Sequence, residues 1–159
     1  MRMAKSIKRY KNWTLITLIL LLLMGAYFVF NPSYQKSIEA KIYYTVGNYD
    51  KAYALSSEAF EMEPYNRMAN SVMVQSRYAL RYVNYNKEAE QYLSIIRSYA
   101  DQDKISLAEQ MRIKMMCDIM IDKHEKMQPT ILIDKELVKE AQKNYERFVK
   151  LHERLIQAL

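Results

Sequence analysis

Hydrophobic and polar positions divide the chain into an apolar N-terminal stretch and a longer part with helical periodicity. The run WTLITLILLLLMGAYFVF extends from Trp13 to Phe30 without a charged residue. As a helix it would be about 27 Å long, close to the thickness of the hydrocarbon core of a bilayer. We therefore predict a membrane-spanning signal-anchor helix over residues 13–30, with the lipid bilayer as its partner.

The flank before this run predicts the orientation of the chain. Residues 1–12 contain five basic residues and no acidic one, and such flanks stay on the cytoplasmic side. A cleaved signal peptide is the alternative, but Met24 is too large for a good cleavage signal and apolar residues continue to Phe30. We expect a single-pass protein of the cytoplasmic (inner) membrane, with its C-terminal part periplasmic or otherwise extracytoplasmic.

The pattern after the apolar run predicts two short helices. Asn31 and Pro32 are suited to cap and begin a helix that reaches about Val46. Gly47 and Asn48 tolerate the left-handed backbone that ends helices. A second helix should then run over residues 49–63, before Pro64. With two Gly, three Pro and many good helix formers, the chain is expected to be all-α.

Residues 33–66 resemble a tetratricopeptide repeat, in which two helices are joined by a short turn and followed by a proline. The residues that carry the resemblance are Ala40, Tyr43, Gly47, Tyr49, Ala52, Ala59 and Pro64. Small residues at these spacings let antiparallel helices approach closely. The pattern departs from the family at Lys36 and Ser56, where large aromatic residues are usual. The resemblance implies a short α-α superhelix.

A lone repeat cannot bury its hydrophobic faces, so a neighbouring unit is expected. The stretch from Asn84 to Ala89, NYNKEA, echoes the NYDKA of the first turn. It predicts a second turn between a helix over residues 67–82 and another that ends near residues 101–103. Two tetratricopeptide-like helical pairs are thus predicted within residues 31–103.

Residues 104–159 predict a divergent third pair. Ser106 and Glu109 have the spacing of a capping box and open a helix to about Lys123. The connection MQPTILI follows, and a long helix then runs from Asp134 to the end of the chain. Its apolar seam consists of Val138, Ala141, Tyr145, Phe148, His152, Leu155 and Leu159. Such a seam fits a helix that caps the solenoid, which we expect, or one that dimerises as a coiled coil.

Charge and cysteine content argue against nucleic-acid binding and against a disulfide-stabilised domain. The net charge is +6, but five of the 24 basic residues lie in the N-terminal flank, which leaves 19 against 18 acidic residues. This balance does not predict nucleic-acid binding. The single cysteine, Cys117, forms no intramolecular disulfide and is expected to be a buried, inert thiol.

Catalytic motifs are missing from the sequence. The stretch from His152 to Ile156 begins like the helical zinc-protease motif, but Ile156 stands where the second histidine is required. Asp118, Asp122 and His124 form the rival candidate for a metal or sensor site, although a solvated helix face is the simpler interpretation. We therefore predict no enzyme, no cofactor and no metal site.

The expected function is that of a non-enzymatic scaffold or accessory subunit that binds a protein partner. The tetratricopeptide resemblance implies a ligand-facing surface on the first helix of each pair, where Lys41, Tyr44, Gln75 and Tyr78 lie. Architectures of this kind serve bacterial envelope machines for secretion, division, cytochrome assembly or flagellar motion. The alternative is a self-associating anchor, a homo-oligomer that dimerises through its C-terminal helix.

Overall fold

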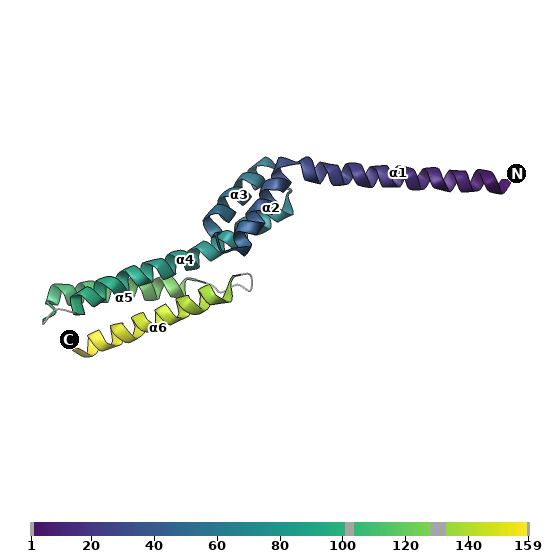
Figure 1. Ribbon diagram of the computed structural model, residues 1–159. Helices are drawn as coiled ribbons and strands as arrows, with labels where there is room; N and C mark the ends of the chain where they lie inside the picture. The colour runs from purple at the N-terminus through teal and green to yellow at the C-terminus, as the bar shows by residue number, and fades with distance from the viewer. Residues whose placement is uncertain (1, 101–103, 128–132, 159) are drawn as a thin grey trace. The chain divides into compact units, whose positions relative to one another are not determined.

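The computed structural model describes the backbone of residues 2–100, 104–127 and 133–158, and side chains within them except those of residues 2–12, 28, 29 and 158. All the regular structure in these residues is helical, which confirms the all-α class (Figure 1). The helices are α1 (Arg2–Phe30), α2 (Pro32–Thr45), α3 (Tyr49–Met62), α4 (Arg67–Ala100), α5 (Leu107–Glu125) and α6 (Lys135–Ala158).

Some predictions lie outside the described residues. They concern the basic side chains of the N-terminal flank, the end of the second pair at residues 101–103, residues 128–132 of the MQPTILI connection, and Leu159 of the seam. The chain divides into two compact units, Met1–Val74 and Gln75–Leu159, with the division inside α4. Each unit is described by itself.

The first unit contains the hairpin of α2 and α3, and its boundaries follow the predicted local signals. The Asn31 side chain accepts a hydrogen bond from the Ser33 N–H at 2.9 Å, and Pro32 occupies the first turn of α2. Gly47 has a φ of 80°, the left-handed backbone that other residues adopt at a cost. Asn48 then caps α3 by accepting from the Lys51 N–H at 3.2 Å. The predicted helix–turn–helix is confirmed.

Small residues form the centre of this unit. Ala40, Ala52 and Ala59 are completely buried, and Val72 of α4 packs with Ala40 and Ala52. Larger side chains surround this centre, including Tyr43. The predicted close approach of α2 and α3 is therefore confirmed, because no side chain larger than a methyl group separates them at these points.

A buried polar network fixes the start of α4 in the first unit. The Asn66 amide nitrogen donates to the hydroxyls of Ser33 at 2.9 Å and Ser37 at 3.0 Å. Its oxygen accepts from the Ala69 N–H at 3.1 Å, so the same side chain caps α4. The Ser33 hydroxyl in turn donates to the carbonyl of Ala59 at 2.8 Å. One asparagine thus connects α2, the end of α3 and the beginning of α4.

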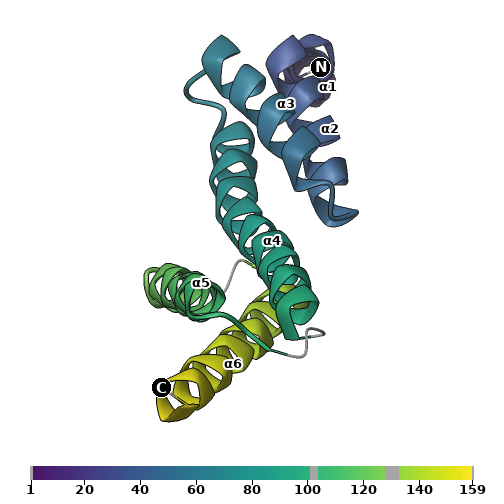
Figure 2. The same cartoon turned by 90° about the vertical axis from the view of Figure 1, so that its left-hand side faces the viewer.

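The second unit is a bundle of the C-terminal part of α4 with α5 and α6 around one core (Figure 2). The buried core residues are Tyr82, Tyr85, Ala89, Leu93, Ile96, Ile113, Cys117, Met120, Ile133, Ala141 and Phe148. At the start of α5, the predicted capping box is confirmed: the Ser106 N–H donates to the Glu109 carboxylate at 2.8 Å, and the Glu109 N–H donates to the Ser106 hydroxyl at 3.3 Å.

The predicted turn from Asn84 to Ala89 is wrong, because α4 is continuous through these residues. The stretch lacks the glycine that makes the first turn at Gly47. Tyr82, Tyr85 and Ala89 are buried on one face of the uninterrupted helix, and a turn here would take that face out of the core. The second predicted hairpin is therefore not formed within residues 67–100, and the architecture shown is all-helical without an established repeat.

The seam of α6 is buried inside its own unit. Ala141 and Phe148 are completely inaccessible, and Val138 and Leu155 pack against the same core. Asn144, 1% exposed, donates through its amide to the amide oxygen of Asn86 on α4 at 3.3 Å. This helix therefore closes the three-helix core with both apolar and polar contacts.

The apolar residues of α1 are exposed along its described length. Large side chains from Trp13 to Tyr27 have exposed fractions of 47% to 67%. Among the described side chains, no single helix has the length and apolar composition of a membrane span, but Trp13–Tyr27 and Pro32–Thr45 have them together, with a bend of 64° between them. A signal sequence near an N-terminus would pass the same test. The described residues thus show a bent N-terminal helix pair with the composition of a span or signal sequence, and the single span over residues 13–30 stays a prediction.

Candidate functional site

The histidine of the rival metal or sensor cluster lies in an aromatic layer. The ring of His124 stacks on Tyr145 with centroids 4.4 Å apart and lies 5.6 Å from the ring of Tyr85. Burial lowers the pKa of His124, because the charged imidazolium loses hydration there. A neutral ring stacked between α4 and α6 is a packing element.

The two aspartates of that cluster are engaged elsewhere. Asp118 lies 2.9 Å from the imidazole Nε2 of His152 and also accepts from Lys114 at 3.0 Å. Asp122 forms an ion pair with Lys126 at 2.6 Å. Across the described parts of the chain, no group of three His, Cys, Asp or Glu side chains is placed to hold a metal ion.

Cys117 lies at the centre of the second unit. It is a completely buried free cysteine, as predicted from its position in a helical run. Burial, with a smaller contribution from the charge of Asp118, raises the pKa of its thiol to about 11. The reactive thiolate is therefore scarce at neutral pH, and the side chain is a core residue.

The four predicted partner-binding residues form two local pairs. On α2, the ammonium of Lys41 lies 5.0 Å from the ring centroid of Tyr44. On α4, Gln75 and Tyr78 are half-buried, and the Arg81 guanidinium lies 5.3 Å from the Tyr78 ring. Because the two pairs belong to different units, a joint surface of all four stays a prediction.

A groove between α4 and α6 was not predicted from the sequence. It has a volume of about 300 Å³ and is lined by Leu93, Arg97, Arg147, Lys150, Leu151 and Arg154. Leu93 is buried and Leu151 half-buried, so the groove has an apolar floor beneath four cationic side chains. The spacing of Arg147, Lys150 and Arg154 on one face of α6 could have indicated it, but Arg97 comes from a distant part of the sequence.

The cations of this basic groove are largely free to meet an external anion. Arg147 forms an ion pair with Glu90 at 3.3 Å and hydrogen-bonds the Asn144 side chain at 3.3 Å. No ion pair to a residue in the described ranges engages Arg97, Lys150 or Arg154. The groove combines a concentrated positive charge with an apolar floor, which suits a partner that presents carboxylates beside a hydrophobic side chain.

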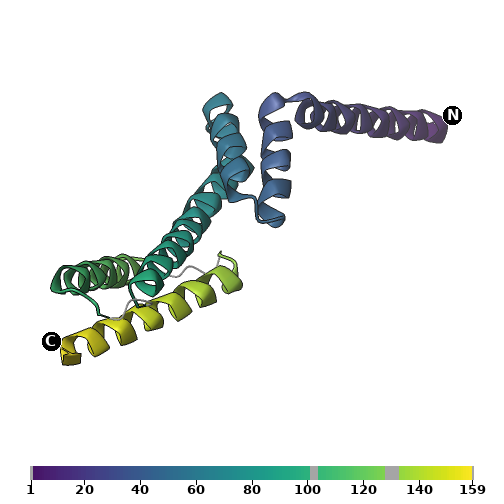
Figure 3. The ribbon, with the colours of Figure 1, turned by 60° about the vertical axis from the view of Figure 1, so that its left-hand side comes forward.

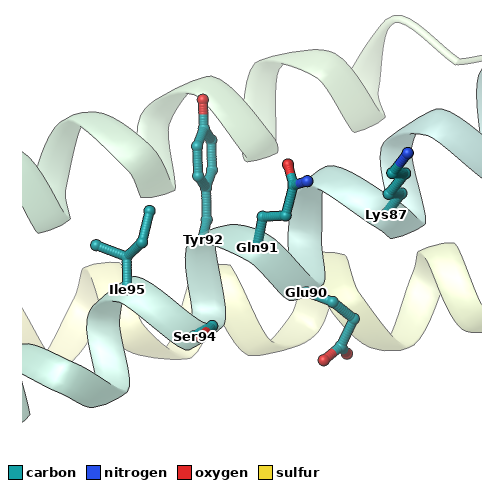
Figure 4. Close-up of a pocket in the computed structure, with 6 residues that line it drawn as sticks. All are labelled: Lys87, Glu90, Gln91, Tyr92, Ser94 and Ile95. Atoms are coloured by element: carbon teal, nitrogen blue, oxygen red, sulfur yellow. The ribbon is translucent and has the colours of Figure 1, made fainter.

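A larger hollow of about 680 Å³ lies along α4, but its shape is less suited to a ligand (Figure 4). All of its lining residues come from one stretch of this helix: Lys87, Glu90, Gln91, Tyr92, Ser94 and Ile95. Tyr92 and Glu90 extend in opposite directions from the helix in Figure 4. Ligand sites usually bring polar groups together around an enclosed volume, and this helix surface does not.

Two stripes of exposed apolar residues complete the candidate surfaces. On α5, Leu107, Met111 and Met115 have exposed fractions of 68%, 58% and 57%. The corresponding stripe of α2 consists of Ile38 and Ile42, with Val46 at the C-terminal cap that follows the helix. In both helices the residues recur every four positions and so share one face. Contiguous apolar faces of this kind mark contacts with other proteins or with membranes.

Comparisons with known proteins add no family or relative to this description. No family model matches the chain, and no curated protein or solved structure matches it at a significant level.

Proposed function

We propose that this protein is a non-enzymatic, membrane-anchored interaction module that holds a protein partner at the outer face of the cytoplasmic membrane. The exposure of the apolar side chains of α1 carries the proposal. Each large aliphatic or aromatic side chain gains about 1.5–3 kcal/mol when it leaves water, and those from Trp13 to Tyr27 remain exposed. A bilayer would cover all sides of such a helix at once.

The partner-binding surface is assigned to the basic groove of the second unit. Its four cations supply electrostatic attraction, while Leu93 and Leu151 supply an apolar contact at the centre. The stripe of Leu107, Met111 and Met115 on α5 provides further contact area in the same unit, and methionine adapts readily to the shape of a partner. The competing candidate is the surface that the repeat resemblance predicts, with Lys41, Tyr44, Gln75 and Tyr78.

The architecture suits an accessory subunit of an envelope complex, such as one for secretion, division, cytochrome assembly or flagellar motion. A self-associating anchor that dimerises through α6 is the alternative function. The burial of Ala141 and Phe148 supports the role of α6 as a cap, because a seam already packed against α4 and α5 is unavailable to a second α6.

Membrane fractionation of the full chain tests the anchor. We expect the protein to stay in the membrane after an alkaline carbonate wash and to migrate at full length, near 19.0 kDa. Leu18→Arg with Leu21→Arg should abolish this retention, because charges in the hydrocarbon core are costly. A shortened, released product would instead identify the N-terminus as a cleaved signal sequence and overturn the proposal.

Crosslinking in intact membranes tests the partner surface. Charge reversal by Arg97→Glu with Lys150→Glu should remove specific crosslinked partners, while Lys139→Glu with Lys143→Glu, which changes exposed charges elsewhere on α6, should leave them. If Tyr44→Ala with Tyr78→Ala removes the partners and the groove variant retains them, the repeat-derived surface is correct. Crosslinks only between copies of the chain would favour self-association.

A further inference from the structure

The exposed stripe on α2 lies opposite the face that packs inside the first unit. Ile38, Ile42 and Val46 have exposed fractions of 52%, 58% and 70%, whereas the neighbouring Ser37 and Ala40 are completely buried. With 3.6 residues per turn, these two sets point to opposite sides of α2. The two isoleucines of α2 therefore face outward, while its small residues face the core.

The junction between α1 and α2 is a defined bend. A single residue, Asn31, separates the helices, and its N–H still donates to the Tyr27 carbonyl at 3.0 Å. Its side-chain amide also donates to the Glu63 carboxylate at the end of α3 at 3.0 Å. These bonds connect α1, α2 and α3 at one point, so the direction of α2 after the bend is set by contacts on both sides.

The bend directs α2 along a membrane that α1 crosses. The two helices differ in direction by 64°, so α2 lies closer to the membrane plane than to the normal when α1 is upright. Spanning helices tilt by about 20° on average, which is enough to lay α2 nearly flat. Figure 3 shows α3 on one side of α2 and α1 extending from the other. The face of α2 opposite α3 is therefore on the membrane side.

We propose that α2 is a second membrane-contacting element, an interfacial helix whose Ile38, Ile42 and Val46 insert among the lipids at the outer surface of the bilayer. This inference rests on the proposed membrane anchor. The occupant is lipid because α2 follows the apolar α1 after one residue and carries its exposed isoleucines on the face opposite α3, which is the membrane side.

The neighbouring charges indicate what kind of lipid contact this is. Glu39 and Lys41 are both exposed beside the stripe, and Lys36, the other cation of α2, forms an ion pair with Glu58 of α3. The helix therefore offers little net positive charge to an anionic headgroup. Contact should depend on burial of the aliphatic side chains. It should therefore occur on phosphatidylcholine alone and change little with salt concentration.

Fluorescence quenching in vesicles tests the position of α2. The native cysteine is first removed by Cys117→Ala, and a single new cysteine is introduced by Ile42→Cys and labelled with an environment-sensitive dye. The labelled full chain is then reconstituted in phosphatidylcholine vesicles. Nitroxide-labelled lipid should quench this dye at least threefold more than a dye at Ala54→Cys, on an exposed position of α3. A dye at Leu21→Cys in α1 reports separately on the anchor.

The outcomes separate the two proposals. Quenching at positions 21 and 42, but not at 54, supports the interfacial helix. Strong quenching at position 21 with equally weak quenching at 42 and 54 overturns the interfacial helix but supports the membrane anchor. No quenching at position 21 overturns both. Weak quenching at position 42 that increases when the protein-to-lipid ratio is lowered would show that a second copy of the chain, and not lipid, covers the stripe, and would overturn the proposal.

Discussion

The buried amide of Asn66 donates a hydrogen bond of 2.9 Å to the hydroxyl of Ser33, at the beginning of α2. The same asparagine caps α4, so one side chain joins the two ends of the helical hairpin to the helix that follows. Both residues are almost completely inaccessible to water. In a small unit whose core consists largely of alanines, a polar contact of this kind helps determine a single packing.

Asn66→Ala should therefore destabilise the first unit. The substitution removes a helix cap and leaves two buried hydroxyls without their donor, for an expected loss of about 2 kcal/mol in the free energy of unfolding. Urea titration of the full chain in mild detergent, followed by far-ultraviolet circular dichroism, measures it. Asn70→Ala, at an exposed position of the same helix, is the control, and an equal loss there would contradict the role of Asn66.

The continuity of α4 predicts a strong effect of proline at Lys87. This exposed residue lies in the interior of the helix, where proline removes a hydrogen bond and costs about 3 kcal/mol or more. Arg67→Pro, at the first position of α4, should be nearly neutral because proline is tolerated there. Thermal unfolding of both variants distinguishes the continuous helix from the turn suggested by sequence, which would accept proline at position 87.

The stability of the second unit should fall as the pH drops below about 6.5, the usual pKa of histidine. Burial lowers the pKa of His124 in the folded state, so below that pH the unfolded chain takes up a proton that the folded chain resists. Stability is therefore highest above the unfolded pKa and declines towards pH 5. In urea titrations, His124→Phe should reduce this fall in the free energy of unfolding between pH 7 and pH 5. His152→Gln should show the same fall as the unsubstituted protein.

A free energy of unfolding that stays constant between pH 7 and pH 5 in the unsubstituted protein would contradict the predicted role of His124. Below pH 5 the carboxylates also take up protons, so the comparison is restricted to the range above it.

Cys117 should react with iodoacetamide only after the second unit opens. Its thiol is fully buried and its pKa is raised to about 11, so thiolate is rare at pH 8 and the reagent has no access. We expect alkylation at pH 8 to be roughly a hundredfold slower than in urea-unfolded protein. An exposed thiol introduced by Ala54→Cys should react in both conditions. Rapid alkylation of the folded protein at Cys117 would show that the core is open.

The elements that sequence predicted well are those with complete local signals. Asn31 with Pro32, Gly47 with Asn48, and Ser106 with Glu109 each determine a helix end through bonds within a few residues. Such interactions need no distant partner, so the residues around a helix end are sufficient to predict them. The small residues Ala40, Ala52 and Ala59 similarly indicated where two adjacent helices approach.

The predictions that failed or stayed incomplete depended on distant contacts. The stretch from Asn84 to Ala89 resembles a turn locally, but Asn86 hydrogen-bonds Asn144 on α6, and Tyr85 packs in a core shared with α5. The basic groove likewise combines Arg97 with residues of α6. No pattern along α4 alone contains either relationship.

The sequence by itself determined the helical class, most helix ends, the apolar character of the N-terminal run and the buried state of Cys117, because these follow from residue type and short-range geometry. Only the tertiary structure decided that α4 is a single helix, that the α6 seam closes its own unit, and that the Ile38 stripe faces away from the core. These features depend on which faces are covered by segments far away in the chain, and burial of those faces outweighs local preferences of a few tenths of a kcal/mol per residue.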